Sequence, residues 1–170
     1  MKTRILTVVL MLVFGLGLAG CGNNTQDAGG DKNVESLKSN QIRIEGVVVA
    51  LDDSIDVIKD KLGELLEYSE SKSCMYEGFD KVYTYSDVKI ITYPKDGGEY
   101  INSITVLSNN VETGCGILIG DTTDAIKGKY AEDKMVITKS CYMYETDDFG
   151  IAFYVESDTV VEIEIYTMAE

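Results

Sequence analysis

The chain has 170 residues, and its 29 acidic residues outnumber its 15 lysines and arginines, so the net charge is −14. A chain this acidic is repelled by nucleic acid, which excludes binding through neutralised phosphates. Histidine is absent, which removes the usual general base near neutral pH and the commonest transition-metal ligand, so we expect no catalysis, no cofactor and no metal.

Residues 1–20 are typical of a secretory signal. Lys2 and Arg4 form a basic start, and an apolar run follows from Ile5 to Leu18. The run is shorter than the roughly 20 residues that span a bilayer. Its end, Leu-Ala-Gly before Cys21, resembles the lipobox of bacterial lipoproteins. The resemblance implies cleavage before Cys21 and lipid, usually palmitate, on its thiol; the alternatives are an uncleaved anchor and a free cysteine.

Residues 21–41 are predicted to be the lipidated cysteine and a flexible tether, because they are polar, rich in Gly, Asn and Ser, and without periodicity. Removing residues 1–20 takes away two basic residues and no acid, which lowers the net charge from −14 to −16. A chain this acidic is repelled by anionic lipid headgroups, so we expect the lipid on Cys21 to be the membrane contact. We expect the protein at the extracytoplasmic face of the cell membrane.

Two copies of one unit are predicted, repeat 1 over residues 42–112 and repeat 2 over residues 113–170. Residues 51–64 align with residues 119–132 at a shift of 68, with six identities in fourteen positions. The identical pairs are Asp53/Asp121, Asp56/Asp124, Ile58/Ile126, Lys59/Lys127, Lys61/Lys129 and Glu64/Glu132. The alternative is chance similarity between two ordinary helices.

Each copy is expected to open with a short apolar strand, over residues 46–51 and 116–119, and to continue as a helix. Asp53 and Asp121 stand where an N-cap accepts free amide hydrogens. Behind the second cap, Ile126 and Tyr130 indicate a short buried face. Behind the first, a longer face is predicted from Ile55, Ile58, Leu62, Leu65 and Leu66.

Strand-like runs follow each helix. In chain order they cover residues 81–86, 88–93, 100–108, 140–145, 150–156 and 159–167. In the last run, Val161, Ile163 and Ile165 are expected on one face and Glu162, Glu164 and Tyr166 on the other. These runs predict an α+β fold: two tandem repeats, each a helical segment followed by an antiparallel β-meander, forming one sheet with helices on one face.

Several segments of the unit, residues 74–85, 91–94, 117–126 and 129–130, resemble a family of small bacterial lipoproteins. The family's fold is shared with the secreted β-lactamase inhibitor protein and the small lipoprotein of the outer-membrane assembly machine. Asp52 stands where the second copy has Gly120, and Ala131 stands where the family tends to have glycine. The resemblance covers about residues 45–167. It implies a concave sheet suited to holding another protein and transfers no functional residue.

Tyrosines on the predicted strands are the candidate binding residues. Tyrosine combines a large contact area and a polar tip with a low entropic cost of ordering. If Glu162, Glu164 and Tyr166 mark the solvent face, then Tyr154 and Tyr93 join it, and these five residues are the predicted partner-binding site. The alternative is that tyrosine simply favours strands and lies half-buried there.

Each of the remaining polar groups has a structural interpretation as well as a functional one. The aspartates at 52, 53, 56, 121 and 124 could attract calcium, but they lack its twelve-residue ligand pattern and suit helix caps. Glu162 and Glu164 are expected on a solvated face rather than as an acid–base pair. Cys74, Cys115 and Cys141 allow one disulfide or none, and their spacing selects no pair.

The sequence therefore predicts a monomeric, lipid-anchored module that binds an envelope protein through the open face of its sheet. The alternative is an inhibitor or enzyme-associated module acting on cell-wall metabolism.

Replacing the predicted lipid attachment residue, Cys21→Ala, should abolish incorporation of labelled palmitate and release the protein from the membrane fraction. Metabolic labelling with cell fractionation measures both effects, and Cys74→Ala is the matched control that keeps both. Undiminished labelling of Cys21→Ala would contradict the lipobox assignment.

Overall fold

The computed structural model describes residues 36–168; the predicted signal, Cys21 and most of the tether lie outside the described residues. The helices are α1 (Ile55–Ile58) and α2 (Thr123–Lys129), and short 3-10 turns cover Lys59–Lys61 and Glu132–Lys134. The strands are β1 (Gln41–Ile44), β2 (Val47–Ala50), β3 (Glu67–Lys72), β4 (Phe79–Thr84), β5 (Val88–Lys95), β6 (Gly98–Val106), β7 (Glu112–Thr113), β8 (Met135–Ile137), β9 (Cys141–Glu145), β10 (Phe149–Glu156) and β11 (Thr159–Thr167).

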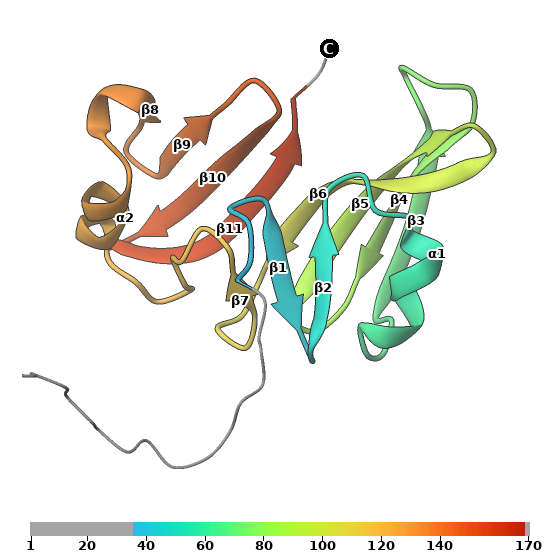
Figure 1. Ribbon diagram of the computed structural model, residues 1–170, viewed down its shortest axis with the longest axis horizontal. Helices are drawn as coiled ribbons and strands as arrows, with labels where there is room; N and C mark the ends of the chain where they lie inside the picture. The colour runs from blue at the N-terminus through green and yellow to red at the C-terminus, as the bar shows by residue number, and fades with distance from the viewer. Residues whose placement is uncertain (1–35, 169–170) are drawn as a thin grey trace, which may run out of the picture. The chain divides into compact units, whose positions relative to one another are not determined.

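Eight of the described strands form one antiparallel sheet in the order β3-β4-β5-β6-β11-β10-β9-β8 (Figure 1). Its central strands β6 and β11 have nine residues each. There Ile104 lies opposite Ile165, and Val106 lies opposite Ile163. All four side chains are fully buried, so the middle of the sheet is also the middle of the core.

A second sheet, β2-β1-β7, covers one face of the large sheet, and Figure 1 shows its strands in front of β6 and β11. Ile42, Ile44 and Val49 of this small sheet belong to the same buried cluster as Ile104 and Ile163. We call the side of the large sheet that faces this cluster the inner face and the opposite side the outer face.

Directly opposed residues of antiparallel strands share a face, so the pairing assigns both faces. One row of opposed residues crosses the inner face through every strand: Tyr68, Tyr83, Ile90, Ile104, Ile165, Ile151, Tyr144 and Met135. The neighbouring row crosses the outer face: Glu67, Thr84, Lys89, Thr105, Glu164, Ala152, Met143 and Val136. The inner row is mostly apolar and the outer row is mixed.

The predicted fold class is wrong. The protein is mostly β rather than a tandem arrangement of helix and meander, because α1 has four residues and α2 seven. A second sheet, rather than a layer of helices, closes much of the core. The four-residue strand β1, which pairs with both β2 and β7, brings that sheet together.

The helix starts also differ from the prediction. Ser54 and Thr122 occupy the N-cap positions, and neither makes a side-chain capping bond. The carboxylate of Asp53 instead accepts a hydrogen bond from the Ala50 amide at 2.9 Å. At the second helix, the Asp121 carboxylate accepts from the Leu118 amide at 2.8 Å. Both aspartates close the turn before the helix, so they are engaged without capping it.

The first helix is far shorter than its apolar pattern suggests. It gives way to the 3-10 turn after Ile58, and Gly63 with φ +88° then turns the chain back toward β3. Leu62 is buried, whereas Leu65 and Leu66 are 44% and 61% exposed. The last two leucines of the predicted helix face therefore lie outside the core.

Local geometry explains the other differences in strand assignment. Residues 116–119 form no strand, because Gly116 and Gly120 have positive φ angles of 69° and 97° and the segment turns. The register between β10 and β11 shifts next to Tyr154, which leaves Val161 39% exposed and brings Val160 into the core. The sequence does not predict β3, because its run of mostly polar residues shows no alternation of polar and apolar side chains.

None of the cysteines in the described residues forms a disulfide. Cys74 is exposed, whereas Cys115 and Cys141 are buried. The Cys115 thiol donates to the hydroxyl of Thr113 at 3.3 Å.

Two leucines of the predicted helix face give a matched test of this fold. Leu62→Ala should lower the free energy of unfolding by about 2–5 kcal/mol, because it empties a buried site. Leu66→Ala should change it by no more than about 0.5 kcal/mol, because the side chain is exposed. Urea unfolding measures both changes. Equal losses of stability in the two variants would indicate that Leu62 and Leu66 are equally buried, as the predicted long helix requires.

Candidate functional site on the outer face

Four of the five predicted site residues lie together on the outer face of β10 and β11. Tyr154 stands opposite Glu162, Ala152 opposite Glu164, and Gly150 opposite Tyr166. The tyrosine and glutamate side chains therefore emerge from adjacent strands on one side of the sheet.

Each tyrosine of this group is tied to a carboxylate. The Tyr154 hydroxyl donates to Glu164 at 3.2 Å, and the Tyr166 hydroxyl donates to Glu145 of β9 at 2.9 Å. Burial and the neighbouring carboxylates raise the pKa of both tyrosines, so both stay protonated donors at neutral pH. The hydrogen bonds hold the rings and the carboxylates in a defined arrangement across three strands.

Small residues make room for these rings. A Cβ atom at Gly150 would come within 2.3 Å of the Tyr166 ring, so only glycine leaves space for the ring to lie over β10. Ala152, Ser103 and Thr105 are the other small residues on this part of the outer face, and they are almost fully buried. The outer face is therefore packed by its own large side chains rather than by another element of the described chain.

Tyr93, the fifth predicted residue, is on the outer face of β5, separated from the other four by β6. Its ring packs between Tyr76, at 5.1 Å between centroids, and Tyr100, at 6.2 Å. Its hydroxyl donates to Asp52 at 2.7 Å. Burial and this carboxylate raise the pKa of Tyr93.

Sequence reasoning missed Glu145, Tyr76, Tyr100 and Asp52 as members of these groups. Counting back across the turn at residues 95–98 would have placed Tyr100 opposite Tyr93, as the register has it. The other three come from different strands or loops, and only tertiary folding brings them in.

The outer face carries more negative than positive charge. The register places six carboxylates and two ammonium groups on it among the described residues: Glu67, Asp80, Glu145, Glu156, Glu162 and Glu164, with Lys89 and Lys95. Tyrosine rings among carboxylates suit a positively charged partner, through ion pairs and cation–π contacts.

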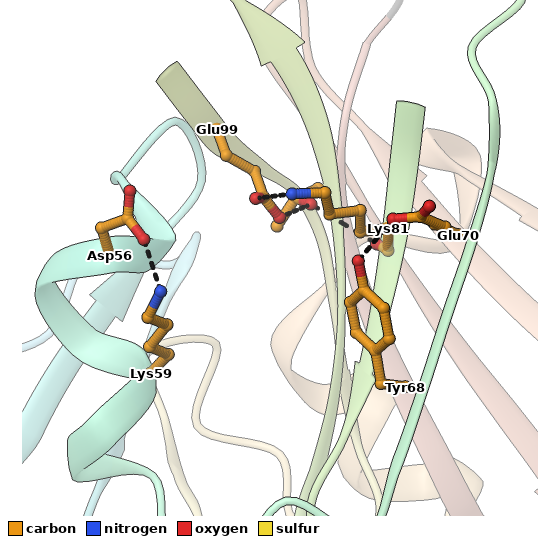
Figure 2. Close-up of polar contacts among 7 residues, drawn as sticks. Asp56, Lys59, Tyr68, Glu70, Lys81 and Glu99 are labelled. Carbon is orange, nitrogen blue, oxygen red and sulfur yellow. Dashed lines mark hydrogen bonds and ion pairs between the residues drawn. The ribbon is translucent and has the colours of Figure 1, made fainter. Parts of the chain in front are cut away.

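A second polar group lies on the inner face near α1, and Figure 2 shows its contacts. The ammonium of Lys81 contacts the Glu99 carboxylate at 2.7 Å, with the Glu99 side chain largely buried and the Lys81 side chain half-buried. Thr92 also donates to Glu99. Beside this pair, Tyr68 donates to Glu70 at 2.6 Å, and Lys59 pairs with Asp56 at 2.6 Å on the helix surface.

The charged and hydroxyl groups of this cluster bond to one another. This arrangement is typical of a cluster that stabilises the fold. Burial by itself raises the pKa of Glu99, but the hydrogen bonds from Lys81, Thr92 and Tyr83 outweigh it. They hold the pKa below its usual value of 4.5. Glu99 is thus a stabilised anion at neutral pH.

No set of three or more His, Cys, Asp or Glu among residues 36–168 is arranged to hold a metal ion. Four of the five aspartates considered for calcium make other contacts: Asp53 and Asp121 close turns, Asp52 accepts from Tyr93, and Asp56 pairs with Lys59. Within the same residues, no helix has the length and apolar character needed to cross a membrane.

Comparisons with known proteins identify no family. No protein-family model matches the chain, and no curated protein matches it. Among solved structures, a cysteine-rich secretory protein from Staphylococcus aureus is similar over 69% of this chain and 43% of its own, with 13% identity and a TM-score of 0.45. The uncharacterized protein yfeY from Escherichia coli is similar over 77% of this chain and 99% of its own, with 13% identity and a TM-score of 0.47.

Likeness at this level supports no statement about function. Neither similar structure is the inhibitor or the assembly lipoprotein that the sequence motifs resemble, so that resemblance stays a prediction. The match spans less than half of the staphylococcal chain.

Acid unfolding tests the partly buried ion pair of Lys81 and Glu99. Because the folded-state pKa of Glu99 is lowered, its stabilisation is present above the unfolded value near 4.5 and is lost as the pH falls through the folded value. Glu99→Gln should cost about 1–3 kcal/mol at pH 7, and the deficit should shrink as the pH falls below 4.5.

Urea unfolding across this pH range measures the deficit. Asp56→Asn, which breaks the exposed pair with Lys59, is the control and should have a smaller effect at pH 7. A deficit for Glu99→Gln that does not vary with pH would contradict this role.

Proposed function

We propose that this protein is a lipid-anchored, extracytoplasmic module that holds a basic segment of an envelope protein on the outer face of its large sheet, without chemistry of its own. The observation that carries the proposal is the group of Tyr154, Tyr166 and their carboxylate partners on the outer face of β9, β10 and β11.

The geometry of this group favours binding over a purely structural role. The tyrosine hydroxyls are already bonded to Glu164 and Glu145, so a partner would not bear the full entropic cost of ordering them. Tyr154 remains 36% exposed, which leaves aromatic area available.

Charge selects the partner's chemistry. Six carboxylates and two lysines on the outer face, on a chain of net charge −14, favour lysine- or arginine-rich segments and disfavour acidic ones. The predicted lipid on Cys21 and a tether with a reach of roughly 25 Å would present this face to proteins close to the membrane.

The proposal is tested by crosslinking on intact cells followed by mass spectrometry. The wild-type protein should capture a segment with more basic than acidic residues. The double variant Tyr154→Ala, Glu162→Lys should reduce that capture by roughly 30-fold, because it removes an aromatic contact and reverses a charge. Raising the salt concentration should weaken capture by the wild type.

Glu132→Lys supplies the matched control, since it reverses an exposed charge in the 3-10 turn after α2. It should capture the segment as the wild type does, and thermal unfolding should show that both variants remain folded. Capture that survives in the double variant, or an acidic captured segment, would rule out the outer face as the binding surface.

A further inference from the structure

The edge strand β3 offers a second, independent binding feature. It ends the large sheet on one side, all six of its residues are exposed, and its pairing with β4 is unbroken over six residues. It contains neither proline nor a bulge, two of the devices that protect an edge, and its charged residues are Glu67, Glu70 and Lys72. The opposite edge, β8, has only three residues.

The register shows which backbone groups of β3 face outward. The Ser73 amide donates to the Gly78 carbonyl in the hairpin that joins β3 to β4. Since hydrogen-bonded and non-hydrogen-bonded pairs alternate along antiparallel strands, the amides and carbonyls of Tyr68, Glu70 and Lys72 point away from β4. They form a regular set of unused donors and acceptors.

A hollow of about 570 Å³ lies against the inner side of this edge. Its lining combines three tyrosines with residues of the turn after α1: Tyr68, Tyr83, Tyr85, Lys59, Asp60, Gly63 and Leu65. The Tyr68 hydroxyl is bonded to Glu70 and the Tyr85 hydroxyl lies 3.4 Å from the Lys59 carbonyl. The lining is therefore mixed, with tyrosine rings and Leu65 beside the charged Lys59 and Asp60. Tyr68 and Leu65 are 46% and 44% exposed at its mouth.

We propose that an extended segment of a partner protein adds to β3 as a ninth strand and places an apolar side chain in this hollow. Outward donors and acceptors at strand spacing suit a partner main chain, and the tyrosine rings and Leu65 of the hollow suit an apolar side chain facing inward. Residues of the added strand that face outward would lie beside Glu67, so basic residues are favoured there. This site does not depend on the outer-face tyrosines.

The test uses a capped synthetic peptide of alternating lysine and threonine with one central leucine. The peptide should bind the wild-type protein and slow hydrogen exchange of the Tyr68, Glu70 and Lys72 amides, as measured by NMR. Replacing the central leucine with serine, or N-methylating alternate peptide amides, should weaken binding.

Two substitutions at one position separate backbone pairing from side-chain effects. Glu70→Pro removes an outward amide without breaking a bond to β4, whereas Glu70→Ala keeps it, and both lose the contact with Tyr68. Glu70→Pro should bind the peptide roughly tenfold more weakly than Glu70→Ala. Thermal unfolding should show that both variants are folded.

Equal affinities of two folded Glu70 variants would overturn the proposal. So would peptide binding without protection of the β3 amides, or no binding by the wild-type protein at all. The double variant Tyr154→Ala, Glu162→Lys should bind this peptide as the wild type does, so failure of the outer-face proposal would be recognised separately.

Discussion

The pairing of β6 with β11 is the constraint on which the other features depend. It joins segments nearly sixty residues apart in sequence, from residues 103–106 to residues 163–166, and it places Ile104 and Ile165 at the centre of the core. Without it the two sets of strands on either side would be separate small sheets. With it, one surface runs across eight strands, and both faces acquire a single register.

Strand alternation then gives the two faces different chemistry. The inner face is buried against the small sheet and the helices, and its central positions are isoleucine and valine. The outer face has no such cover among the described residues, so its positions can carry charge and tyrosine. The same alternation that fills the core therefore gathers Tyr154, Glu162, Glu164 and Tyr166 on one surface.

The two polar groups of the protein differ in the way their charges are compensated. On the inner face, Glu99 is balanced by Lys81 and by hydroxyl donors, which is what a largely buried carboxylate needs to remain charged. On the outer face, the carboxylates outnumber the lysines, and two of them, Glu164 and Glu145, accept hydrogen bonds from tyrosine hydroxyls. The first arrangement is complete in itself, whereas the second leaves negative charge for a partner to neutralise.

The sequence by itself was sufficient to predict the strands with strong apolar alternation: the prediction for residues 159–167 coincides with β11, and those for β5, β6, β9 and β10 are close. It was also sufficient to place all five candidate residues on one face, although Tyr93 on β5 lies apart from the four on β10 and β11. It could not predict β1, which is too short for a periodic signal. Nor could it predict β3, because all of its side chains are exposed and no alternation of polar and apolar residues marks the strand. Tertiary structure alone decided that a second sheet closes the core, that Leu65 and Leu66 stay outside it, and that Glu145 and Asp52 join the tyrosines. Each of these outcomes depends on contacts between residues far apart in the chain, and such contacts leave no local pattern.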